Sequence, residues 1–131
     1  MASAIGHQAC SLGYKVVYFN TVKLFTMLKT SKAEGSYIKQ ISKLEKQDLL
    51  ILDDFGLKGL DNINRYSFME IIEDRHGKKS TIIASQLPVE AWHEIIGEQT
   101  IADAILDRLV HTAHRIDIKG ESMRKKLKNK Q

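Results

Sequence analysis

The most constraining feature of this 131-residue chain is an aliphatic run, residues 49–52, that leads directly into two adjacent carboxylates, Asp53 and Asp54. The run shows no polar alternation, so it predicts a strand buried on both faces, as in the middle of a parallel sheet. Acids at the end of such a strand lie at the carboxyl edge of the sheet, where open α/β folds bind ligands. Because neighbouring carboxylates repel each other unless a cation or a proton separates their charges, the pair indicates a divalent metal site.

The rest of the chain predicts strands that alternate with helices. Apolar runs at 16–19 and 80–85 predict two further strands, and an alternating run at 115–119 predicts a less buried one. Strands separated by helices imply a parallel sheet with right-handed crossovers, so the expected fold class is α/β. From the helix at 61–75, six residues are expected to supply the core: Ile63, Tyr66, Phe68, Met69, Ile71 and Ile72. Residues 30–36 predict a loop, and helical patterns cover 2–12, 22–29, 37–45, 61–75, 89–96 and 101–112.

Composition narrows the class of protein. No apolar run approaches the roughly 18 residues that span a bilayer, and a single cysteine excludes an internal disulfide, so we expect a cytoplasmic protein without a membrane span. Residues 1–118 hold fourteen Lys/Arg against fifteen Asp/Glu, whereas residues 119–131 hold six against one. We therefore expect a near-neutral body at 1–118 and a basic tail at 119–131. Such a tail is either a solvated terminus or a contact to nucleic-acid phosphates.

The acidic pair by itself leaves three interpretations open. A hydrophobic strand ending in Asp-Asp is the pattern of a Walker B motif, in which Asp53 would hold Mg²⁺ and Asp54 would orient or activate the attacking water. A receiver domain also binds Mg²⁺ through an acidic pair, and Ser85 and Lys119 would supply its later Ser/Thr and Lys. However, a strand precedes the pair here, and no Asp follows the 80–85 strand. The third interpretation is that the acids only cap the following loop.

Three later segments decide between these interpretations. They are Ile82–Pro88 (IIASQLP), Ile105–Leu109 (ILDRL) and Gly120–Lys125 (GESMRK). Together with the LLILDDFG run, they resemble the AAA+ ATPases of the IstB/DnaC group, which comprises transposition helpers of insertion sequences and replicative helicase loaders. The resemblance extends from residue 1 to about 126 and leans towards the transposition helpers. It implies a three-layer αβα P-loop NTPase core that uses ATP and Mg²⁺.

The resemblance assigns roles to four residues at the sheet edge. Asp53 and Asp54 match the Walker B acids, which makes both of them magnesium-site residues and makes Asp54 catalytic. Ser85 and Gln86 fall at sensor 1, where a polar side chain contacts the γ-phosphate or the attacking water. All four are therefore expected near the phosphates of ATP.

The resemblance also assigns roles to two arginines. Arg108 matches the arginine finger, a catalytic residue that reaches the nucleotide of the neighbouring subunit. Arg124 matches sensor 2, which contacts phosphate within the same subunit. The alternatives are that Arg108 forms a surface salt bridge with Asp107 or Asp103, and that Arg124 is a solvated member of the basic tail.

The chain departs from the family pattern at the phosphate loop. The family requires G-x-x-x-x-G-K-[ST], whose backbone N–H groups and lysine cradle the phosphates, and this sequence contains no such motif. In the AAA+ strand order 5-1-4-3-2, the first strand is central. We therefore expect an AAA+ fragment that lacks its central first strand, exposes two unpaired strand edges that favour self-association, and binds ATP weakly or not at all.

These expectations combine into one functional hypothesis and one rival. The full-length parent would bind Mg-ATP between subunits of a homo-oligomer, assemble on DNA, and present that DNA to a transposase or a replicative helicase. The rival is a non-catalytic DNA-binding or oligomerisation remnant of such an ATPase.

Overall fold

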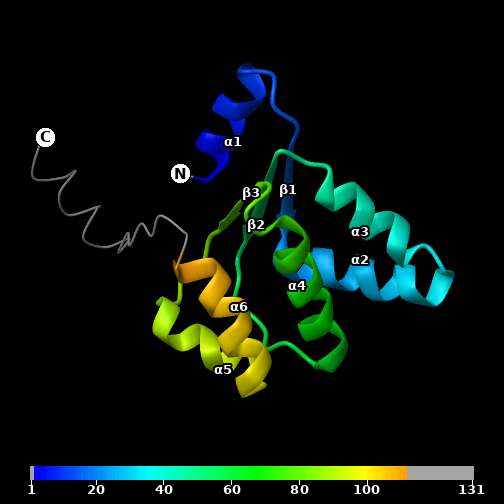
Figure 1. Cartoon of the computed structure of the whole chain (residues 1–131), viewed down its shortest axis with the longest axis vertical. Helices are drawn as coiled ribbons and strands as arrows, with labels where there is room; N and C mark the ends of the chain where they lie inside the picture. The colour runs from blue at the N-terminus through cyan, green and yellow to red at the C-terminus, as the bar shows by residue number, and fades with distance from the viewer. Residues whose placement is uncertain (1, 112–131) are drawn as a thin grey trace, which may run out of the picture.

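The computed structural model describes residues 2–111, which form a three-stranded parallel sheet with helices on both of its sides (Figure 1). The strands are β1 (Val16–Asn20), β2 (Leu49–Asp53) and β3 (Ser80–Ile83), in the order β1-β2-β3. The expected parallel α/β arrangement is confirmed for this part of the chain. The strand predicted at 115–119 and the tail at 119–131 lie outside the described residues.

The helices connect these strands as the sequence pattern predicts. Helix α1 lies on one side of the sheet, and the other helices gather on the opposite side (Figure 1). None of the helices within residues 2–111 has the length and apolarity needed to cross a membrane. Their bounds are α1 (Ala2–Ser11), α2 (Thr21–Glu34), α3 (Tyr37–Glu45), α4 (Asn62–Arg75), the 3₁₀ turn η1 (Val89–Ala91), α5 (Trp92–Ile96) and α6 (Gln99–His111).

Strand β2 is the buried centre of the sheet. The strand is hydrogen-bonded to β1 on one side and to β3 on the other, and Leu50, Ile51 and Leu52 are each at most 1% exposed because both faces of the sheet are covered. Leu50 and Leu52 belong to the main core cluster. Ile51 points towards α1, where a Cβ atom on Gly6 would lie only 2.7 Å from Ile51 Cδ1. The prediction that this run is buried on both faces is confirmed.

Helix α2 is longer than predicted, so the loop expected at 30–36 is wrong. Its polar residues satisfy their side chains within the helix: the Thr30 hydroxyl donates to the Thr26 carbonyl at 3.1 Å, and the Ser31 hydroxyl donates to the Leu28 carbonyl at 2.7 Å. The helix then ends at Gly35, whose φ of 78° is a left-handed cap that suits glycine. These hydrogen bonds leave both hydroxyls satisfied inside the helix, so the polar stretch carries no unpaired hydroxyl there.

The core under the sheet contains a chain of aromatic rings in edge-to-face and tilted contacts. Phe68 lies 5.9 Å from Phe25 and 5.3 Å from Phe55, and Phe55 lies 4.8 Å from Trp92, as measured between ring centroids. Ile63 and Tyr66 are 47% and 62% exposed, so their predicted place in the core is wrong. The other predicted core residues of α4 are confirmed: Phe68, Ile71 and Ile72 are buried, and Met69 packs against the core cluster.

Arg75 is a buried charge at the opposite edge of the sheet from the acids. It is 2% exposed and donates four hydrogen bonds. Its acceptors are Thr81 Oγ1 at 2.9 Å and the carbonyls of Leu44, Gln47 and Ser80 at 2.6, 2.8 and 2.6 Å. Burial lowers the pKa of the guanidinium. One side chain thus joins the end of α3, the turn after it, and the start of β3.

Candidate functional site

The candidate site lies at the carboxyl edge of the sheet, where three parallel strands end side by side. Asn20 ends β1 and is the register partner of Asp53, which ends β2. Ser85 follows β3 two residues after its last residue, Ile83. Parallel strands end at the same edge of a sheet. Asp53, Asp54 and Ser85, which were expected around the phosphates, therefore share that edge with Asn20, which was not.

Asp53 is fixed by hydrogen bonds from three neighbours. Its Oδ1 accepts from the Asp54 backbone N–H at 2.8 Å, and its Oδ2 accepts from the Tyr18 hydroxyl. Its main-chain carbonyl accepts from the Thr21 hydroxyl at 2.6 Å. The bonds from Tyr18 and from the Asp54 N–H orient the carboxylate and leave further lone pairs on both of its oxygens, while Thr21 holds the main chain from the start of α2.

Asp54 adopts an unusual backbone conformation. Its φ is 57°, and it is the one non-glycine residue with positive φ among the described residues. Asn20 Nδ2 donates to Asp54 Oδ2 at 3.1 Å, while Asn20 Oδ1 accepts from the Lys23 backbone N–H at 3.2 Å and so caps α2. One asparagine therefore ties the second acid to the start of α2. This second role follows from the register that places Asn20 opposite Asp53, which is known only from the structure.

Ser85 lies beside the acidic segment, but its hydroxyl is engaged by the main chain. It donates to the Phe55 carbonyl and accepts from the Leu87 backbone N–H at 3.1 Å. The predicted strand at 80–85 ends early by its formal bounds, although Ala84 still donates to the Leu52 carbonyl at 2.8 Å. Gln86 is exposed. The structure thus places Ser85 where it can hold the acidic loop against β3.

Arg108 lies on α6 and contacts α4. Its Nη2 pairs with Glu73 Oε1 at 2.5 Å, and its Nη1 donates to the Ala104 carbonyl at 2.8 Å. Of the acids considered from the sequence, Asp103 pairs with His93 at 2.8 Å. Arg124 lies outside the described residues. Within one subunit, therefore, these contacts of Arg108 connect two helices and do not reach the acidic pair.

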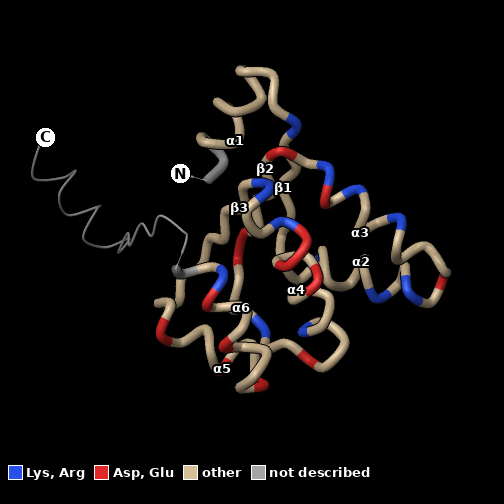
Figure 2. Tube along the Cα trace, viewed as in Figure 1, with Lys and Arg blue, Asp and Glu red and all other residues tan. Residues whose placement is uncertain are grey.

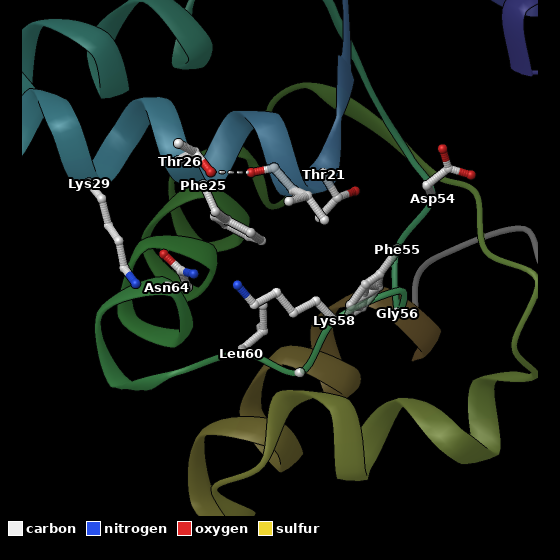
Figure 3. A pocket seen from close by; sticks show the side chains of 12 residues that line it. Thr21, Phe25, Thr26, Lys29, Asp54, Phe55, Gly56, Lys58, Leu60 and Asn64 are labelled. Carbon is white, nitrogen blue, oxygen red and sulfur yellow. Dashed lines mark hydrogen bonds between the residues drawn. The ribbon is translucent and has the colours of Figure 1, made fainter.

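A small cavity of about 70 Å³ lies next to Asp54, between α2, the loop after β2 and the start of α4. The Asp54 carboxylate points away from it, whereas Lys29 and Lys58 extend into it (Figure 3). Thr21 and Asn64 also line it. Sequence patterns could not indicate this cavity, because its walls come from three separate segments.

The oxygen chemistry of the edge suits a magnesium ion. Among residues 2–111, no group of three or more His, Cys, Asp and Glu side chains converges as a self-sufficient metal site. Mg²⁺ does not need one, since it is commonly bound by one or two carboxylates together with substrate phosphates and water. The paired carboxylates of Asp53 and Asp54 fit that requirement.

Comparison with known proteins gives a family for the whole chain. The profile of the family described as "IstB-like ATP binding protein" matches residues 1–131. The chain is 52% identical over 130 residues to a protein of Sinorhizobium fredii named as an insertion sequence ATP-binding protein, covering 99% of this chain and 53% of that protein. It is 33% identical to the insertion sequence IS21 ATP-binding protein of Pseudomonas aeruginosa, covering 99% of this chain and 49% of that protein. The chain thus spans about half the length of these relatives.

Solved structures give the same fold. A DNA replication initiation factor superposes with a TM-score of 0.74 at 19% identity, covering 98% of this chain and 39% of that chain. The DnaC helicase loader superposes with a TM-score of 0.59 at 25% identity, covering 73% of this chain and 59% of that chain. The fold is therefore similar to that of AAA+ P-loop NTPases, as the sequence predicted. The chain belongs to the IstB-like ATP binding protein family.

Proposed function

We propose that this chain is the core of a cytoplasmic helper ATPase for insertion-sequence transposition. The observation that carries the proposal is the acidic pair at the end of the central buried strand, with Ser85 at the end of the neighbouring strand. Membership of an ATP-binding family supports a nucleotide at this edge. The insertion-sequence relatives favour transposition, and the likeness to the DnaC helicase loader makes helicase loading the second candidate.

The two acids divide the work at this edge. When bound, Mg²⁺ neutralises charge on the β- and γ-phosphates of the nucleotide. Asp53 holds the metal through a carboxylate that Tyr18 already orients. Asp54 orients or activates the attacking water. The Asn20 side-chain amide holds the Asp54 carboxylate in position for this role. Arg108 acts on the nucleotide of a neighbouring subunit, and Gln86 and Arg124 contribute phosphate contacts.

DNA is the proposed macromolecular partner, and a charged surface supports it. Residues 21–46, which form α2, α3 and the turn between them, carry six lysines and only two glutamates. Figure 2 shows these cations along both helices. Such a surface attracts a polyanion without reading its sequence. The complete protein would assemble there as a homo-oligomer and present the DNA to a transposase or, in the second candidate, to a replicative helicase.

The 131-residue chain is expected to bind ATP weakly or not at all, because it contains no G-x-x-x-x-G-K-[ST] motif to cradle the phosphates. Titration with a fluorescent ATP analogue in the presence of Mg²⁺ should give a Kd of about 1 mM or weaker. Saturable micromolar binding that depends on Mg²⁺ would contradict this expectation. A lack of ATP binding is also the result that the rival hypothesis predicts, in which the chain is a non-catalytic remnant that retains the ATPase surface.

The proposed function is tested by Asp54→Asn in a protein that contains this chain at the full length of its relatives. Loss of the carboxylate should lower the rate of ATP hydrolysis by about 10²–10⁴-fold, while ATP binding persists because Asp53 and the fold remain. Asp48→Asn is the matched control, since Asp48 lies at the opposite edge of the sheet, where it accepts from the Lys15 backbone N–H. Equal hydrolysis by both variants would exclude a catalytic role for Asp54.

A further inference from the structure

Asp54 keeps its left-handed backbone between two fixed neighbours. Before it, Asp53 ends β2, and its Oδ1 accepts from the Asp54 backbone N–H at 2.8 Å. After it, Phe55 is 2% exposed, and its backbone N–H donates to the Ala84 carbonyl at 3.0 Å. A positive φ is uncommon outside glycine and persists only where the surrounding structure enforces it. The direction of the Asp54 carboxylate therefore depends on the contacts that fix Phe55.

Trp92, the first residue of α5, fixes the ring of Phe55. The two ring centroids lie 4.8 Å apart at an angle of 73°, an edge-to-face arrangement that favours one orientation of the rings. The Phe55 ring also lies 5.3 Å from the ring of Phe68, so it is held between α4 and α5. In Figure 3 the Phe55 ring and the Asp54 carboxylate point to opposite sides of the loop. Packing that holds the ring therefore also holds the carboxylate.

The same indole fixes the main chain of Phe55 through a series of hydrogen bonds. Trp92 Nε1 donates to the Leu87 carbonyl at 3.1 Å. The Leu87 backbone N–H donates to Ser85 Oγ at 3.1 Å, and the Ser85 hydroxyl donates to the Phe55 carbonyl. Leu87 also packs against Gly56, where an added Cβ would lie 2.8 Å from Leu87 Cδ1. Two separate routes from Trp92 thus end on Phe55.

We propose that Trp92 is a positioning residue that, by acting through Phe55, holds Asp54 in place for ATP hydrolysis. The inference rests on the proposed function, because the role that Trp92 supports is that of Asp54 towards the attacking water. A misplacement of about 1 Å caused by a substitution away from the chemistry can cost about 10²-fold in rate. Loss of the indole should therefore slow hydrolysis much more than it weakens the binding of ATP.

The test compares Trp92→Leu with Leu44→Ala in a protein that contains this chain at the full length of its relatives. Leu44 is buried in the same core cluster, but its carbonyl accepts from Arg75 at the opposite edge of the sheet. Trp92→Leu should lower kcat by about 10–10²-fold and change KM for ATP by less than about twofold. Leu44→Ala should leave kcat within about twofold at a temperature where both variants are folded. Equal losses of kcat in the two variants would overturn the proposal.

The effect of Trp92 should also depend on the Asp54 carboxylate. In the Asp54→Asn background the carboxylate is already absent, so Trp92→Leu should lower kcat by less than a further factor of about two. An undiminished loss in that background would show that Trp92 supports only the fold. Trp92→Phe keeps a ring against Phe55 and should recover part of the rate; no recovery would contradict a role for the ring contact. Asp54→Asn measured alone tests the proposed function, so either proposal can fail without the other.

A measurement on the 131-residue chain needs no nucleotide. Asn20 Nδ2 donates to Asp54 Oδ2 at 3.1 Å, so the NMR signal of the Asn20 side-chain amide reports on the position of the carboxylate. Trp92→Leu should shift this signal, whereas Leu44→Ala should leave it in place. An unmoved Asn20 signal in a folded Trp92→Leu chain would overturn the proposal.

Discussion

A full-length protein that carries Arg108→Ala is expected to bind ATP normally and to hydrolyse it about 10³-fold or more slowly. An arginine finger contributes about 10³–10⁵ in rate, because it stabilises charge that develops only in the transition state. In the single subunit, Arg108 contacts Glu73 and the Ala104 carbonyl and does not touch the acidic pair, as a residue that serves a neighbouring subunit should. The measurement is steady-state ATP hydrolysis together with nucleotide affinity.

Glu73→Gln is the matched control for this prediction. It removes the ion pair that holds Arg108 against α4 but leaves the guanidinium in place. The pair is partly exposed, with 29% of the Arg108 side chain and 41% of the Glu73 side chain accessible, so its loss should matter little for stability. If Glu73→Gln lowers hydrolysis as much as Arg108→Ala, or if Arg108→Ala also abolishes ATP binding, the arginine serves the packing of α4 and α6.

Arg75→Ala is expected to destabilise the fold by about 3–5 kcal/mol, which is a large share of the roughly 5–15 kcal/mol that holds a typical domain together. The substitution leaves the carbonyls of Leu44, Gln47 and Ser80 without their donor in a buried place. It also opens a cavity between the end of α3 and the start of β3. Urea unfolding followed by far-UV circular dichroism measures the loss.

Two comparison variants make the role of Arg75 specific. Arg75→Lys keeps the positive charge but cannot reproduce the planar fork that reaches four acceptors, so it should recover only part of the lost stability. Lys79→Ala removes a neighbouring, partly exposed cation that pairs with Asp48 at 3.2 Å, and it should cost less than about 0.5 kcal/mol. A full rescue by lysine would indicate that charge alone matters at this position.

The fold could be predicted where a pattern depends on near neighbours in the sequence. The aliphatic run of β2 specified a strand with two buried faces, and Leu50 and Ile51 are buried on opposite sides. Asp61 and Asn62 are both typical capping residues before the helix at 61–75, and it is Asp61 whose Oδ1 accepts from the Asn64 backbone N–H at 2.8 Å. In such cases the cause of the structure lies within a few residues, so periodicity and capping are sufficient.

The predictions failed where partners distant in sequence decide the outcome. Tyr66 is apolar enough for a core position, but α4 packs through Phe68 and its neighbours, and this rotation of the helix depends on α2 and on the loop after β2. Arg75 lies in the last turn of α4, where a lysine or arginine is common, so its local sequence does not indicate burial. Its acceptors, Leu44 and Gln47, lie 31 and 28 residues away in the sequence.

The candidate site was likewise predictable only in part. The acidic pair and Ser85 were predicted at one edge of the sheet, and the strand order brings them there. The amide of Asn20 on the second acid follows from the register of β1 against β2, which the sequence does not state. Roles that require a neighbouring subunit, as proposed for Arg108, stay predictions.

The left-handed backbone at Asp54 also restricts how this position can change in evolution. Asn and Gly tolerate positive φ, whereas β-branched and bulky residues are strained there. Single-nucleotide changes in an aspartate codon reach Asn and Gly as well as Val and Tyr. A gene for this chain that replaces Asp54 can therefore keep the fold most easily by passing through Asn or Gly.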